Sequence, residues 1–133
     1  MDTSGWTEPL IGNSSDHEGM ARFYRSLIAQ KRSLVTTNYV LTELVALLTT
    51  RSRFTRPELV AIVNGIRRIS HFTLVHIDPA TDAIAWAMLE KYTDKEWSLA
   101  DAASFVVMRR MGITEAFTTD HHFAQAGFVR VPA

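Results

Sequence analysis

The chain has 133 residues, of which 47% are apolar, and its 14 basic and 14 acidic residues balance to a net charge of zero. This length and composition exclude a disordered chain and are typical of one globular domain around a single core. Cysteine is absent, which excludes disulfides and thiolate metal ligands, and no apolar run is long enough to cross a membrane. No secretory leader opens the sequence, so we expect a cytoplasmic protein.

The first half of the chain alternates predicted helices with short strands. Apolar residues at helical spacing predict a helix over residues 16–31, and a strand is expected at 33–37. Thr37 is placed to cap the next helix, whose apolar face is formed by Val40, Leu41, Leu44, Val45 and Leu48. The Thr-Arg-Pro-Glu sequence at 55–58 has the form of a capping box with proline in the first turn, and it predicts a further helix.

The middle of the chain repeats this rhythm. An alternating segment at 72–77 predicts a strand, and a helix is expected over residues 79–92. We expect the core side of this helix to carry Ile84, Ala85, Met88 and Leu89, and we also place Trp86 in the core. Ser98 is then placed to cap a helix that reaches Met111.

The C-terminal segment completes the pattern. Gly112 is placed to end the preceding helix, and a strand at 116–119, a helical turn at 121–126 and a strand at 128–131 follow. Strands that alternate with helices in this way predict a doubly wound α/β/α sandwich with a mostly parallel central sheet. Without an internal repeat or linker, we expect a single domain over residues 1–133.

Two acidic residues lie on predicted apolar helix faces, where an unpaired carboxylate is costly to bury. Asp101 shares its side of the helix with Phe105 and Met108, and Glu43 lies along the edge of the apolar face of its helix. Each also has a plain structural interpretation. Asp101 can form a capping box with Ser98, and Glu43 can be a partly exposed residue at the edge of the core.

Two further acids are expected at the ends of strands. Asp120 follows the strand at 116–119, at the edge of a parallel sheet where ligands bind, and Asp2 has the look of another strand-to-helix junction. Asp120 can equally be an ordinary helix cap. If such carboxylates converge, a hard cation such as Mg²⁺ or Mn²⁺ must neutralise them, and the site would suit phosphodiester hydrolysis. The order along the chain leaves open whether the four acids converge.

The sequences around these acids resemble those of PIN domains, and the nearest group is VapC-like, the toxin nucleases of bacterial toxin–antitoxin pairs. The resemblance spans almost the whole chain, in the family's order and at its separations. It is carried by Asp-Thr-Ser-Gly-Trp at 2–6, Thr-Thr-Asn-Tyr-Val-Leu-Thr-Glu at 36–43, Asp-Lys-Glu-Trp-Ser-Leu-Ala-Asp at 94–101 and Thr-Thr-Asp-His-His-Phe at 118–123.

The resemblance implies a metal-dependent endoribonuclease that uses Mg²⁺ or Mn²⁺ and leaves a 5′-phosphate and a 3′-hydroxyl. Asp2 and Asp101 would be the principal metal ligands, and Glu43 and Asp120 would complete the acidic pocket, directly or through water. Thr3, Ser98 and Thr119 stand beside these acids, where they would orient them or serve as plain caps and turn residues. The implied partners are an RNA substrate, an antitoxin protein and a second copy in a homodimer, with no membrane.

The chain departs from the family pattern at two places. Family members carry a run of apolar residues before the first aspartate, which forms a central strand, whereas only Met1 precedes Asp2 here. We therefore expect the first strand to be truncated before Asp2, and favour a late or trimmed start over structural damage. Ala102 stands where close relatives often carry cysteine, which removes no ligand.

Other side chains near the acidic segments admit a functional and a structural interpretation. Trp97 can stack on an RNA base, but we favour packing ahead of a helix. His122 can approach a substrate phosphate, but we favour a surface histidine, and its neighbour His121 makes a shared zinc site improbable because adjacent helical residues point about 100° apart. Glu96 is expected to face solvent.

The sequence also leaves a second class of function open. A PIN-like domain that lacks its first strand is able to bind RNA or protein without cutting it, so a non-catalytic module is the alternative. A phosphorylatable receiver-like domain is disfavoured, since it needs a strand-borne aspartate near mid-chain and a late lysine. No glycine-rich phosphate loop is present, so we expect no nucleotide cofactor.

Overall fold

The computed structural model describes residues 33–51, 54–69, 71–118 and 121–131, together with Arg25 and Ala29, which are helical. The rest of the helix expected at 16–31, and the segments that hold Asp2 and Asp120, lie outside the described residues. The elements in chain order are β1 (Leu34–Thr37), α3 (Asn38–Arg51), α4 (Arg56–Arg67), β2 (Phe72–Val75), α5 (Pro79–Lys91), α6 (Leu99–Met111), β3 (Glu115–Phe117), α7 (His122–Gln125) and β4 (Val129–Val131).

The described strands form two parallel pairs. Strand β1 pairs with β2, from Leu34 opposite Phe72 to Thr37 opposite Val75. Strand β3 pairs with β4, from Glu115 opposite Val129 to Phe117 opposite Val131. Each pair is connected through helices, as parallel strands require. This pattern agrees with the predicted α/β class and its mostly parallel sheet.

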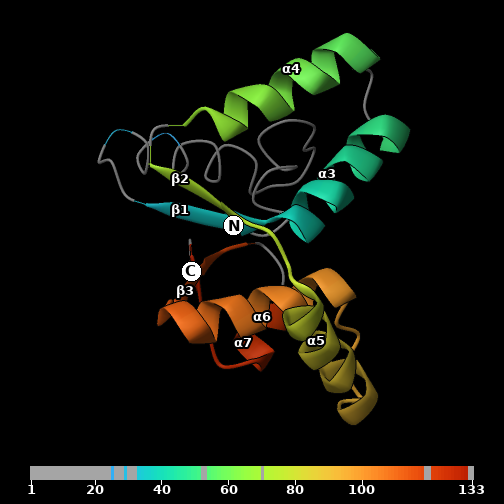
Figure 1. Cartoon of the computed structure of the whole chain (residues 1–133), viewed down its shortest axis with the longest axis vertical. Coiled ribbons are helices and arrows are strands. Elements are labelled where there is room, and N and C mark those ends of the chain that lie inside the picture. Colours follow the sequence, from blue (N-terminus) through green and yellow to red (C-terminus); the bar gives the residue numbers. More distant parts are fainter. Residues whose placement is uncertain are drawn as a thin grey trace.

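Helices lie on either side of the strands (Figure 1). Helix α4 contacts β2, whereas α6 contacts β1. The first core cluster joins α3 and α4 through buried side chains of Val40, Leu44, Leu48, Leu59 and Ile66. The second cluster surrounds α6 and includes Phe105, Met108 and Phe123. The predicted apolar faces of α3 and α4 are therefore the faces that pack.

Helix α6 is the central helix of the described structure, because every residue from Ala100 to Met108 is buried. Its small residues Ala102 and Ala103 lie against Ala85 of α5, so that α5 and α6 approach closely. Gly112 ends the helix in the left-handed conformation, with φ 69°, which glycine adopts without steric cost. The predicted start at Ser98 and end at Gly112 are both confirmed.

The predicted core side of α5 is partly wrong. Ala85 is fully buried, but the side chains of Ile84 and Trp86 are 44% and 50% exposed. The helix packs chiefly on α6 along a narrow stripe through Thr81 and Ala85. Side chains next to Ala85 in sequence are rotated by about 100° to either side of that stripe, which leaves both in solvent.

The strand predicted at 72–77 is also too long, since β2 ends at Val75. The backbone N–H of Ile77 donates instead to the side-chain oxygen of Asn38, at 2.8 Å. This bond ties the loop before α5 to the first turn of α3 and diverts the backbone from the strand ladder.

A cavity of about 580 Å³ lies between the two strand pairs. Among the described residues, its walls are formed by β1 on one side, by β3 on the other and by Ser104, Val107, Met108 and Met111 of α6. None of the helices in the described ranges is both long and apolar enough to span a membrane.

Candidate active site

Asp101 is the most deeply buried of the predicted site residues that the structure describes, with 5% of its surface exposed. It lies in the first turn of α6 and forms a capping box with Ser98. The backbone N–H of Asp101 donates to Ser98 Oγ, and the backbone N–H of Ser98 donates to Asp101 Oδ2, each at 3.0 Å. The cap predicted at this position is confirmed, but capping alone does not explain why the carboxylate faces the interior.

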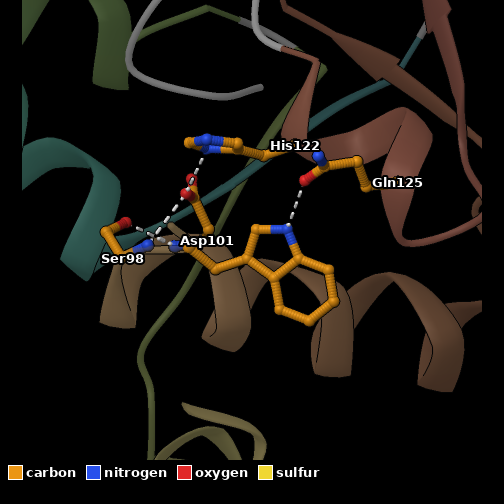
Figure 2. Close-up of polar contacts among 5 residues, drawn as sticks. Ser98, Asp101, His122 and Gln125 are labelled. Atoms are coloured by element: carbon orange, nitrogen blue, oxygen red, sulfur yellow. Dashed lines mark hydrogen bonds and ion pairs between the residues drawn. The ribbon is translucent and has the colours of Figure 1, made fainter. Parts of the chain in front are cut away.

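His122 makes a further contact with the same carboxylate. Its Nδ1 lies 3.0 Å from Asp101 Oδ2, so two nitrogen donors converge on one oxygen (Figure 2). Because a carboxylate oxygen accepts, this contact assigns a hydrogen to Nδ1. The side chains of His122 and Asp101 are 15% and 7% exposed. The expectation that His122 is a surface residue is therefore wrong.

Helix α7 holds His122 in place through its other side chains. Phe123 is 2% exposed and its ring meets that of Phe105 edge to face, with 4.9 Å between the ring centroids. The side-chain oxygen of Gln125 accepts a hydrogen bond of 3.1 Å from Trp97 Nε1. One turn of helix is thus attached at three points, through His122 and Phe123 to α6 and through Gln125 to Trp97, just before α6.

Trp97 belongs to the core rather than to an exposed RNA-binding surface. It is 8% exposed, and its ring lies edge to face against Phe105 with 5.1 Å between the centroids. Its indole N–H donates a hydrogen bond to the side-chain oxygen of Gln125. Packing ahead of the helix, the interpretation favoured for this residue, is confirmed, and base stacking by this side chain is excluded by its burial.

Glu43 is half-buried on α3, at the boundary between core and solvent, and α3 contacts α6. Glu96 is exposed, as expected. The predicted site residues Asp2 and Asp120, with Thr3 and Thr119 beside them, lie outside the described residues. Of the predicted set, the structure brings Ser98 and Asp101 together, and it adds His122.

The donor chemistry of the described residues fits a hard divalent cation. Asp101 and Glu43 offer carboxylate oxygens, the ligands that Mg²⁺ and Mn²⁺ prefer, and a buried carboxylate is stabilised by a nearby cation. Within the described ranges, no group of three or more histidine, aspartate or glutamate side chains is arranged to hold a metal ion. A cation held by either carboxylate would need further ligands beyond the described residues.

The sequence holds one signal that bears on His122. Phe123 is the large apolar residue of the predicted helical turn, so its burial is expected, and a buried Phe123 fixes the side on which the preceding residue stands. The sequence does not reveal that Asp101 occupies that side, because the two residues belong to different elements. Their contact is a property of the fold.

Comparison with known proteins gives concordant results. The PIN domain family matches residues 1–129. The "23S rRNA-specific endonuclease VapC20" of Mycobacterium tuberculosis, from strains CDC 1551 and H37Rv, is 34% identical over 133 residues, which cover 98% of this chain and 95% of that protein.

A solved structure agrees with this result. The crystal structure of Mycobacterium tuberculosis VapC20, described as a sarcin-ricin loop cleaving toxin, matches with a TM-score of 0.80 and 32% identity, over 96% of this chain and 94% of that chain. The resemblance and the fold class predicted from the sequence are both confirmed. The chain belongs to the PIN-domain family and is VapC-like.

Proposed function

We propose that this chain is a metal-dependent endoribonuclease that hydrolyses phosphodiester bonds of RNA. The observation that carries the proposal is the buried Asp101 carboxylate, held by two nitrogen donors at the start of the central helix of a VapC-like PIN domain. A carboxylate kept in the interior by dedicated donors costs stability, and such an arrangement is typical of functional sites.

The substrate that we propose is 23S rRNA, cut within the sarcin-ricin loop. The relative from Mycobacterium tuberculosis is named for its action on 23S rRNA, and its structure is described as that of a toxin that cleaves this loop. The similarity extends over nearly the full length of both chains, which supports carrying the substrate class across. RNA loops of this kind are recognised by shape and by splayed bases, so related surfaces favour related targets.

In this proposal, Asp2, Glu43, Asp101 and Asp120 hold Mg²⁺ or Mn²⁺. When bound, the ion supplies a water of lowered pKa and neutralises charge on the phosphate. The protein itself contributes carboxylates held in a fixed arrangement. For Asp101, the hydrogen bond from the backbone N–H of Ser98 restrains the carboxylate. Mutual repulsion of the acids is relieved when the cation binds, so metal affinity and site geometry depend on each other.

We extend to this chain the partners and location expected from the family resemblance. They are an antitoxin protein that restrains the nuclease, a second copy in a homodimer, and the cytoplasm. Sedimentation of the purified chain, alone and with the product of a neighbouring antitoxin gene, tests both associations. A chain that sediments as a monomer and does not bind the antitoxin would contradict this part of the proposal. The proposed nuclease activity would not be affected by that result.

The decisive experiment uses a synthetic RNA stem-loop with the sarcin-ricin sequence, and intact ribosomes as a second substrate. We expect cutting at one position with Mg²⁺ or Mn²⁺, and loss of cutting with a chelator or in Asp101→Asn. End-group analysis is expected to find a 5′-phosphate on the downstream product. Binding of either RNA without cleavage, in the presence of metal, would contradict the proposal and favour the non-catalytic module.

A further inference from the structure

We infer that His122 is a positioning residue of the proposed nuclease site, which holds the Asp101 carboxylate in the orientation that a metal ion requires. This inference rests on the proposed function. It concerns a histidine whose contact with Asp101 appears only in the folded structure, since the two residues are 21 positions apart in the sequence.

Among the described residues, Ser98 and His122 donate to the Asp101 carboxylate from different elements. Ser98 belongs to the turn that starts α6, and its N–H restrains the carboxylate from the same helix. His122 reaches the same oxygen from α7, at 3.0 Å. A single donor leaves the carboxylate able to turn about its bonds, whereas donors from two directions fix its plane. Because both side chains are largely buried, solvent competes little with these bonds.

The position of His122 does not depend on its own bond to Asp101. Helix α7 is anchored independently by Phe123, which packs in the core, and by Gln125, whose side-chain oxygen accepts from Trp97 Nε1. Figure 2 shows the Gln125 bond beside the contact of His122 with Asp101. The exposed His121 ring adds an edge contact to the His122 ring, with 4.7 Å between centroids. Helix α7 therefore delivers the imidazole to the carboxylate, and removal of the imidazole leaves the helix attached.

A hydrogen bond to a ligating carboxylate acts on the metal through that carboxylate. Partners of this kind orient the ligand and tune its affinity, and their loss typically weakens metal affinity or activity by about 10- to 100-fold. His122 uses Nδ1 for the carboxylate, so through this nitrogen it acts as a donor to a ligand and not as a ligand itself. The expected effect is on the metal and on turnover, with RNA affinity nearly unchanged.

The test compares His122→Ala, His122→Asn and the native protein. Asparagine carries an N–H donor on an atom bonded to Cγ, where Nδ1 stands in histidine, so it keeps the donor and removes the ring. We expect His122→Ala to raise the Kd for Mn²⁺, measured by calorimetry, by about 10-fold and to lower kcat by about 10- to 100-fold at saturating Mn²⁺, with KM for the RNA changed less than about threefold. His122→Asn should recover most of both losses.

Gln125→Ala is the matched control, because it removes a hydrogen bond between α7 and Trp97, just before α6, that does not involve Asp101. We expect it to lower the thermal midpoint about as much as His122→Ala does, while Mn²⁺ affinity and kcat stay within about twofold of native. If both alanine variants lose Mn²⁺ affinity equally, or if His122→Asn behaves like His122→Ala, the inference is overturned and His122 serves only to attach α7.

The two possible failures are distinguishable. Native protein that is folded but binds no Mn²⁺ overturns the proposed function, and this inference with it. Native protein that binds Mn²⁺ and loses it in Asp101→Asn, while His122→Ala binds as native does, overturns only the role of His122. Circular dichroism of each variant confirms that the fold is retained.

Discussion

The N-terminal ends of α4 and α6 are built from the same local pattern, yet they stand in different surroundings. In α4, Thr55 and Glu58 form a capping box with bonds of 2.9 and 3.3 Å, and both residues are exposed. In α6, Ser98 and Asp101 form the equivalent box, but Asp101 is buried and receives a further donor from His122. A cap in water only starts a helix, whereas the buried cap also holds a charged group in the interior.

The largest difference between the two boxes is expected in catalysis. Asp101→Asn keeps the shape of the side chain and removes its charge, so we expect RNA cleavage to fall by more than the roughly 10- to 100-fold typical of residues that act through a ligand. Glu58→Gln makes the same chemical change at the exposed box and should leave cleavage within about twofold of native. Initial rates on the stem-loop RNA measure both. Equal losses in the two variants would remove the functional distinction between the boxes.

The second comparison concerns the free energy of unfolding after the hydroxyl acceptor of each box, on Ser98 or on Thr55, is removed. Ser98→Ala leaves the buried N–H of Asp101 without this acceptor, which costs about 1–3 kcal/mol. We also expect a lower cleavage rate, because the turn that carries the Ser98 donor is loosened. Urea denaturation at neutral pH measures the change in the free energy of unfolding. A loss no larger than that in Thr55→Ala would mean that burial of the α6 cap adds nothing to its strength.

Thr55→Ala is the milder counterpart. The N–H of Glu58 is close to solvent, so water replaces the lost hydroxyl, and the expected cost is about 1 kcal/mol or less. The same urea titration measures it, and RNA cleavage at a temperature well below the unfolding transition should be unchanged. A large loss of activity in this variant would place the N-terminus of α4 in the substrate-binding surface.

The smallest effect concerns pH. Hydrogen bonds from the backbone and the side chain of Thr55 lower the pKa of Glu58 from its ordinary value of 4.5. A carboxyl with a lowered pKa in the folded state contributes stability that is present above pH 4.5 and lost as the pH falls through the folded value. The urea midpoint of the native protein should therefore exceed that of Glu58→Gln most at pH 7, and the difference should shrink by pH 3. A difference that grows toward pH 3 would reverse the sign and contradict this account.

Local signals in the sequence predicted the helix boundaries well. The caps at Thr37, Thr55 and Ser98 and the stop at Gly112 depend on residues a few positions apart, and the structure confirms each of them. Family resemblance identified the PIN domain from segments around the predicted acids, and the comparisons confirm it.

Errors arose where the answer depends on distant neighbours. Ile84 and Trp86 are apolar residues on α5, and the narrow contact of α5 with α6 explains why they face solvent. The sequence favoured a surface position for His122, whereas in the structure α7 places its ring against Asp101. Convergence of Asp2, Glu43, Asp101 and Asp120 is of the same long-range kind, and it stays a prediction.

The two parallel strand pairs also differ in how far apart their partners stand in the sequence. Leu34 pairs with Phe72, 38 residues later, whereas Glu115 pairs with Val129 only 14 residues later. The entropic cost of closing the longer loop is greater by about 0.9 kcal/mol of free energy, and this difference favours the C-terminal pair as the first to form. Helix α7 lies between β3 and β4, so this early closure carries His122 with it. Asp101 lies outside that loop, but its contact with His122 spans 21 residues, fewer than the 38 between Leu34 and Phe72, so loop-closure entropy favours this contact over the N-terminal strand pair as well.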